Sequence, residues 1–236
     1  MKHEPQKLRI DVDPALSVSG LLLRPARAIA CYVFAHGAGA GMMHPFMAHA
    51  ASGLCDRGVA TLRYQFAYME KGARRPDAPP LAHAVVRAAV TEAARLCPDV
   101  LLVAGGKSFG TRMTSQAQAL RPLVGVRGLV FFGFPLHPAG KPSIDRARHL
   151  SDVQVPMLFL QGTRDKLAEP TLIQDVVKTL APRVTLGEID GADHSFHVPA
   201  KLLARSGRSD MDVLNEALDA VVHWLSLIAG LNRSGR

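Results

Sequence analysis

Short apolar runs alternate along the chain with longer amphipathic segments. Four runs, CYVFA, VLLVAGG, GLVFFGF and PMLFLQG, are apolar at nearly every position. That pattern is typical of central strands in a parallel sheet that is covered by helices on both faces. We predict strands at Ser17–Arg24, Ala30–Ala35, Val59–Tyr64, Val100–Gly105, Gly128–Phe134, Pro156–Gly162 and Val184–Ile189, with a weaker one at Lys7–Asp13.

The segments between these strands have helical character. We predict helices at Pro45–Arg57, Leu81–Leu96, Gly110–Leu120, Pro170–Leu180 and Asp212–Ala229. Because strands and helices alternate, the fold class predicted is α/β, a mostly parallel, doubly wound sheet of about seven or eight strands. Ligands of such sheets bind beyond the carboxyl ends of the strands, so we look for chemistry in the loops that follow them.

Composition is consistent with a single domain over residues 1–236. Hydrophobic residues make up 48% of the chain and charged residues 20%, which argues against disorder. No apolar run approaches the ~20 residues that span a bilayer, and the first residues lack the apolar stretch of a secretory signal. Cys31, Cys55 and Cys97 are too scattered for a disulfide framework or a zinc site. We therefore expect a cytoplasmic protein without a membrane partner.

The strongest chemical motif follows the strand VLLVA. Gly106, Ser108 and Gly110 form G-x-S-x-G, with a buried-type strand before it and a helical pattern after it. In this context the serine sits in a strained turn that projects its hydroxyl above the sheet as a nucleophile. An ordinary loop with a solvated serine is the alternative. A phosphate-binding loop is excluded, because Leu101 stands where that motif requires glycine.

A serine nucleophile needs a base and an orienting acid, in the chain order serine, acid, histidine. Asp165 follows the strand PMLFLQG, and His194 follows the last strand. We expect His194 to accept the proton of Ser108 and Asp165 to orient the imidazole. Asp193 is interpreted as a loop-shaping acid. The competing residues are Glu169 for the acid and His137 or His197 for the base.

The loop after the first parallel strand reads His36-Gly-Ala-Gly-Ala-Gly41. Its glycines alternate, so the spacing fails the dinucleotide-binding pattern G-x-G-x-x-G. Acyl transfer needs two N–H groups that face the developing oxyanion, and Ala38 and Phe109 are our candidates. A merely flexible loop is the alternative. His36 is interpreted as a structural hydrogen-bonding residue.

The formal net charge of +8 is spread along the chain, apart from the cluster Lys71, Arg74 and Arg75. Nucleic-acid surfaces combine a dense basic stripe with aromatic residues, which are only 6% here, so no nucleic-acid partner is expected. The cluster follows a strand end, and Lys107 precedes the nucleophile. These four cations are candidates for steering an anionic substrate, with a solvated loop as the alternative.

Ser108, Asp165 and His194, with the His36-Gly37 loop, resemble the α/β-hydrolase superfamily over about 200 residues. A narrower group, the small bacterial hydrolases similar to the testis-expressed and NSL-complex-subunit proteins, is resembled by the pieces HGAGAGMMHPFM, RYQFAYME, GGKSFGTRM, FPLHPAGKP and QGTRD. Dienelactone-hydrolase-like enzymes are a broader neighbour, although these often use cysteine where this chain has Ser108. The resemblance implies a hydrolase without a known substrate, and some animal members are scaffold subunits.

Many members of this superfamily insert a cap domain after the sixth strand. Here the segment between Phe134 and Pro156 is short and has room for one small helix, at Ile144–Leu150. We therefore expect a lidless serine esterase for small or short-chain carboxylic esters, needing no metal or organic cofactor. Thioester or amide hydrolysis, a haloperoxidase-like or lyase side activity, and a catalytically silent interaction module are the alternatives.

Overall fold

The computed structural model describes residues 4–233, in which eight strands form one sheet. The strands are β1 (Gln6–Asp13), β2 (Leu16–Leu23), β3 (Ala30–Ala35), β4 (Val59–Tyr64), β5 (Leu101–Lys107), β6 (Val126–Phe132), β7 (Met157–Gly162) and β8 (Val184–Ile189). Their order is β1-β2-β4-β3-β5-β6-β7-β8. The strands β4, β3, β5, β6, β7 and β8 are parallel to one another. The strand β2 is antiparallel to both of its neighbours, β1 and β4.

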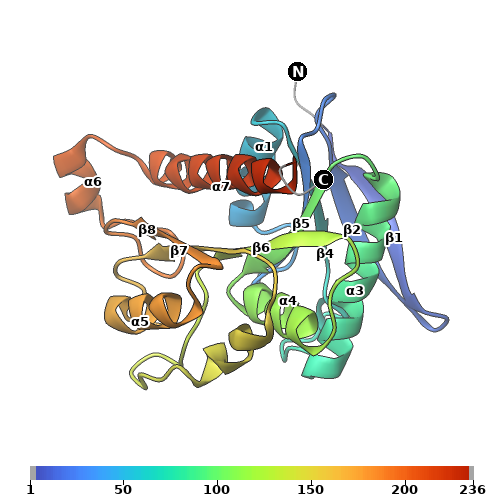
Figure 1. The fold of residues 1–236 in the computed structure, drawn as a ribbon, viewed down its shortest axis with the longest axis horizontal. Coiled ribbons are helices and arrows are strands. Elements are labelled where there is room, and N and C mark those ends of the chain that lie inside the picture. The colour runs from blue at the N-terminus through green and yellow to red at the C-terminus, as the bar shows by residue number, and fades with distance from the viewer. Residues whose placement is uncertain (1–3, 234–236) are drawn as a thin grey trace.

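Helices cover both faces of the sheet (Figure 1). On one face lie α1 (Pro45–Asp56) and α7 (Asp210–Arg233), and on the other α3 (Pro79–Leu96), α4 (Phe109–Leu120) and α5 (Pro170–Leu180). The shorter elements are α2 (Ala67–Glu70), η1 (Asp145–Asp152, a 3₁₀ helix) and α6 (Ala200–Ser206). Each face buries its own apolar cluster, as the two-sided hydrophobicity of the central strands requires.

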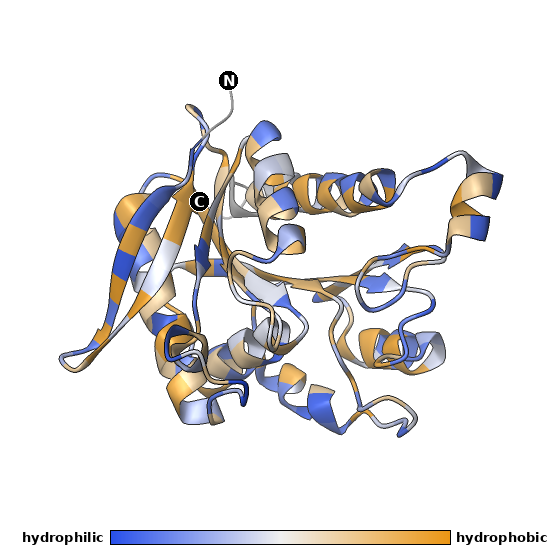
Figure 2. Cartoon of the chain, turned by 180° about the vertical axis from the view of Figure 1, so that it is seen from behind, coloured by the Kyte–Doolittle hydropathy of each residue, from blue (hydrophilic) through white to orange (hydrophobic). Residues whose placement is uncertain are grey.

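The predicted fold class is therefore confirmed, with one refinement at the sheet edge. The edge hairpin of β1 and β2 is antiparallel and alternates hydrophilic and hydrophobic positions (Figure 2). Between β6 and β7 the chain forms η1 and loops, without a cap domain. The short helices α2 and α6 were not predicted. The prediction of one domain over residues 1–236 includes residues 1–3 and 234–236, which lie outside the described part of the chain.

Within the described residues, α7 is the one helix that is long and apolar enough, by length and composition, to cross a membrane. Its buried side chains include Val213, Leu218, Val221 and Trp224, which pack in the cluster that covers the sheet. This packing explains its hydrophobicity, because a helix that lies along a sheet needs a broad apolar stripe.

Candidate active site

Ser108 lies at the tight turn between β5 and α4. Its backbone has φ 52° and ψ −111°, a left-handed conformation that residues other than glycine rarely adopt. A β-carbon on Gly106 or Gly110 would lie 2.5 or 2.6 Å from the Ala35 carbonyl oxygen. Only glycine permits this close approach of the turn to β3. The turn has the features expected of a nucleophile elbow.

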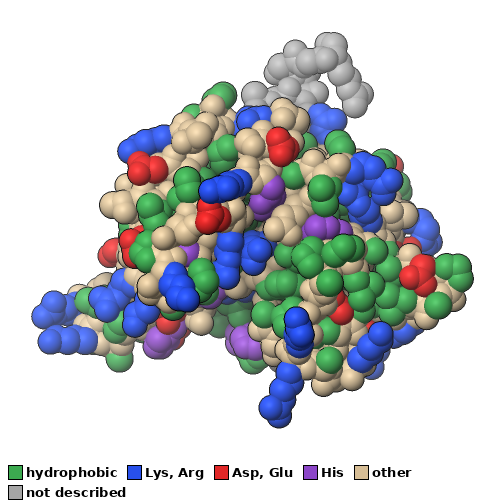
Figure 3. All heavy atoms as spheres, turned by 90° about the horizontal axis from the view of Figure 1, so that it is seen from below, with side chains coloured by type: hydrophobic (Ala, Val, Ile, Leu, Met, Phe, Trp, Pro, Cys, Tyr) green, Lys and Arg blue, Asp and Glu red, His purple; other side chains and the backbone are tan. Residues whose placement is uncertain are grey.

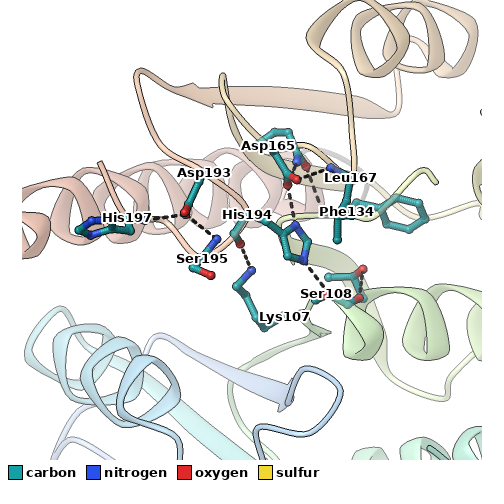
Figure 4. Close-up of polar contacts among 11 residues, drawn as sticks. Lys107, Ser108, Phe134, Asp165, Leu167, Asp193, His194, Ser195 and His197 are labelled. Atoms are coloured by element: carbon teal, nitrogen blue, oxygen red, sulfur yellow. Dashed lines mark hydrogen bonds and ion pairs between the residues drawn. The ribbon is translucent and has the colours of Figure 1, made fainter. Parts of the chain in front are cut away.

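The structure brings together the three residues proposed as a triad (Figure 4). The His194 Nε2 atom lies 2.7 Å from Ser108 Oγ, and its Nδ1 atom lies 2.7 Å from Asp165 Oδ2. A carboxylate accepts the Nδ1 hydrogen, which leaves Nε2 as the acceptor for the serine hydroxyl. The arrangement can move a proton from Ser108 to His194.

Asp165 is buried, at 3% exposure, and its oxygens are held by further donors. The Leu167 N–H donates to Oδ1 at 2.8 Å, and Gln161 Nε2 donates to Oδ2 at 2.5 Å. Gln161 also accepts from the Phe134 N–H at 3.0 Å, so one amide joins β7, the acid and the loop after β6. Sequence reasoning missed Gln161. In the sequence, Gln161 could have been recognised as a polar residue near the end of an apolar strand, four positions before Asp165.

The two competing histidines contact other groups. His197 pairs with Asp210 at 2.6 Å, and His137 Nδ1 lies 2.9 Å from the Pro138 carbonyl oxygen. Glu169 is the residue before α5 and makes no side-chain cap there. Asp193 accepts the N–H groups of Ser195 and His197, at 2.8 and 3.0 Å, so it shapes the loop as expected.

Lys107, a candidate for steering an anionic substrate, lies against the loop of the proposed base. Its ammonium donates to the His194 backbone carbonyl and lies 5.6 and 5.2 Å from the ring centres of Phe46 and Phe196. Burial lowers the pKa of Lys107 to about 8, against the opposing effect of Asp165 and Asp193. The side chain is thus packed against the base's loop rather than extended into solvent, and a direct substrate contact stays a prediction.

The glycine-rich loop lies beside the elbow. A β-carbon on Gly37 would lie 3.7 Å from the Ser108 β-carbon. Tyr68 of α2 holds the loop, because its hydroxyl accepts the Gly39 N–H at 2.9 Å. The described hydrogen bonds use neither the Ala38 nor the Phe109 N–H, which leaves both donors available for an oxyanion.

His36 supports the same loop from beneath. Its Nδ1 hydrogen is donated to the Gly37 carbonyl at 2.7 Å, and Nε2 accepts the Phe66 N–H at 3.1 Å. Complete burial lowers the pKa of His36 to about 4, so the ring is neutral at pH 7. These contacts confirm a structural role for His36.

Lys71, Arg74 and Arg75 are exposed in the loop that follows α2. On the face drawn in Figure 3, basic side chains are scattered and do not form one continuous stripe. The loop is adjacent to Tyr68, which holds the glycine-rich loop, so the position is compatible with electrostatic steering. That role stays a prediction.

Residues 28–226 match the family model of the alpha/beta hydrolase domain. Among solved structures, a dienelactone hydrolase from Anabaena variabilis has a TM-score of 0.72 at 21% identity, covering 95% of this chain and 98% of its own. A lidless α/β serine hydrolase from Xanthomonas campestris has a TM-score of 0.70 at 22% identity, covering 94% and 95%. The esterase domain of a Rhodothermus marinus protein has a TM-score of 0.68 at 16% identity, covering 94% and 97%.

At these identities the structural likeness shows the fold alone, whereas the family model spans most of the chain. The narrower likeness to the testis-expressed and NSL-subunit group stays a prediction. The chain belongs to the α/β-hydrolase family.

Proposed function

We propose that this chain is a serine hydrolase that cleaves carboxylic esters with the triad Ser108, His194 and Asp165. The observation that carries the proposal is the continuous series of hydrogen bonds from Ser108 through His194 to the buried Asp165, each 2.7 Å long. A nucleophile, a base and an orienting acid in contact are the minimum for acyl transfer.

In the proposed cycle, Ser108 Oγ attacks the ester carbonyl while His194 Nε2 accepts the hydroxyl proton. The N–H groups of Ala38 and Phe109 stabilise the oxyanion that forms. His194 then returns the proton to the leaving alcohol as the carbon–oxygen bond breaks, which leaves an acyl group on Ser108. Water, deprotonated by His194, attacks this acyl-enzyme and releases the carboxylic acid. The cycle requires no metal or organic cofactor.

Several features support a small, short-chain ester as the substrate. Between β6 and β7 the described chain inserts only η1 and loops, so no cap domain is available there to build a tunnel for a long acyl chain. One structural neighbour is itself described as an esterase domain. Thioesters and amides would use the same triad. We propose the cytoplasm as the setting, because Cys31, Cys55 and Cys97 are all free and buried.

A fluorophosphonate probe tests the mechanism against the rival of a catalytically silent module. It should label the wild type and the matched control Ser195→Ala, which removes an exposed hydroxyl beside the base. It should not label Ser108→Ala. Labelling that survives Ser108→Ala would contradict the assignment of the nucleophile, and an unlabelled wild type would favour the silent module.

A further inference from the structure

A cavity of about 800 Å³ lies between the edge hairpin and α1. Its walls are mainly apolar and include Leu8, Leu21, Leu23, Met42 and Ala48. None of the triad residues lines it. Its volume is within the range of small-molecule sites, roughly 300–1,000 Å³.

Arg63 is the polar feature of this cavity. It lies in β4 directly opposite Leu21 of β2, so the two side chains share the face that α1 covers. The residue is 4% exposed, which is unusual for arginine. A charged side chain at this depth ordinarily has an ionic partner.

The guanidinium of Arg63 has one hydrogen bond among the described residues, from Nη1 to the Met42 carbonyl at 3.0 Å. Its Nε is buried without a partner. The Met42 carbonyl is the only described acceptor of the guanidinium and occupies Nη1 alone. Since a guanidinium has five N–H donors, most of its hydrogen-bonding capacity is unused.

The surrounding charges favour an anion. No acidic residue lines the cavity in the described part of the chain, whereas Lys7 and Arg9 stand at its rim. Arg9 is already engaged, since Nη2 donates to the Ser17 carbonyl at 2.9 Å and Nη1 lies 3.5 Å from Glu70. Burial lowers the pKa of Arg63, but arginine starts so high that it stays cationic at pH 7.

We propose that this cavity is a binding site, distinct from the triad, for a carboxylate with an aliphatic chain, whose carboxylate pairs with Arg63 and whose chain lies between the hairpin and α1. The apolar walls provide burial for the chain, and Arg63 is the only buried cation among the described lining residues. The acid released by the proposed reaction is of this class, but the inference stands without that reaction.

Calorimetric titration with octanoate tests the proposal, with octylamine as the ligand of opposite charge. Octanoate should bind the wild type at one saturable site, and octylamine should not. Arg63→Met should weaken octanoate binding by about tenfold or more, because it removes a charge-assisted pair. The matched control Arg9→Met, at the rim, should change the affinity much less.

Ser52→Phe provides a second test that leaves Arg63 in place. Ser52 is exposed on α1 and lines the cavity, so the ring should fill the space without disturbing the core. Loss of octanoate binding in this variant supports the site. Equal affinity in wild type, Arg63→Met and Ser52→Phe would overturn the proposal. A second result would also overturn it: octanoate competes with an ester substrate, and its inhibition constant is the same in the wild type and in Arg63→Met. The acid would then bind at the triad.

Discussion

The Lys107 ammonium donates a hydrogen bond to the backbone carbonyl of His194. Lys107 immediately precedes the proposed nucleophile, and His194 is the proposed base. The contact therefore joins the last residue of β5 to the loop after β8, and it fixes the base relative to Ser108 from a second direction. Lys107 is a positioning residue in this arrangement.

We predict an alkaline fall in kcat/KM near pH 8 that depends on Lys107. The pKa of Lys107 is about 8, so the ammonium is charged below that pH and loses its proton above it. Lys107→Arg keeps the charge and should move the fall to higher pH. Lys107→Met should lower kcat about tenfold and abolish this limb, because it removes a charge-assisted hydrogen bond. The same limb at pH 8 in Lys107→Met would contradict the assignment.

The triad residues should act as a unit. Ser108→Ala and His194→Ala should each lower kcat by roughly a thousandfold or more, and the double variant should be little worse than either. Circular dichroism melting should remain close to that of the wild type, with Ser195→Ala as the active control. Wild-type turnover in Ser108→Ala would exclude the mechanism.

Acid should destabilise the fold through His36. The pKa of His36 is about 4 in the folded chain against an ordinary 6.5, so below pH 6.5 the unfolded chain takes up the proton first. Stability should thus fall as the pH drops from 6.5 to 4, by up to ~3 kcal/mol from this residue. His149, whose pKa burial and Arg112 also lower to about 4, adds to the same slope.

Urea unfolding at several pH values measures this dependence. His36→Gln retains an acceptor for the Phe66 N–H but does not titrate. Its free energy of unfolding should therefore fall less steeply between pH 6.5 and 4, with the His149 contribution remaining. Identical slopes in the variant and the wild type would refute the role of His36.

The acyl preference should be short. Burial of each methylene is worth ~0.8 kcal/mol, which an enzyme with a deep apolar tunnel gains along the whole chain. The described residues place no cap over the triad, so the gain should end after the first few carbons. A series of p-nitrophenyl esters from acetate to palmitate measures this. A kcat/KM that rises steadily past about eight carbons would indicate an acyl pocket.

Charge in the loop after α2 should favour anionic esters. Replacing Lys71, Arg74 and Arg75 together by glutamine should lower kcat/KM severalfold for an anionic ester and leave a neutral ester of equal size unchanged. Added salt should weaken the preference in the wild type, because these side chains are exposed and screened. Equal salt dependence of the two esters would exclude steering.

The sequence predicts the central strands well because their apolar runs are continuous. β3, β4 and β8 have the predicted limits, whereas β5 extends to Lys107, beyond the predicted Gly105. The helices α2 and α6 were missed because four and seven residues are too few for a clear helical period. Hydrophobic periodicity cannot identify an element that spans only one or two helical turns.

The proposed triad could be derived from the sequence because strand ends and chain order restrict it strongly. Gln161 and the contact of Lys107 could not, since both depend on how β6, β7 and the last loop meet in space. Arg63 lies inside a predicted strand, where one cation among apolar residues gives no indication that its Nε is buried without an acceptor. Pairing partners are a property of tertiary structure.

The left-handed backbone of Ser108 provides the nucleophile at a cost to the stability of the fold. Such a conformation costs on the order of 1–3 kcal/mol in a residue that has a β-carbon. Glycine would adopt it freely but would carry no hydroxyl. Selection for heat resistance without a demand for turnover would therefore remove the nucleophile, and heat-resistant descendants obtained in that way would include well-folded proteins that have lost their chemistry.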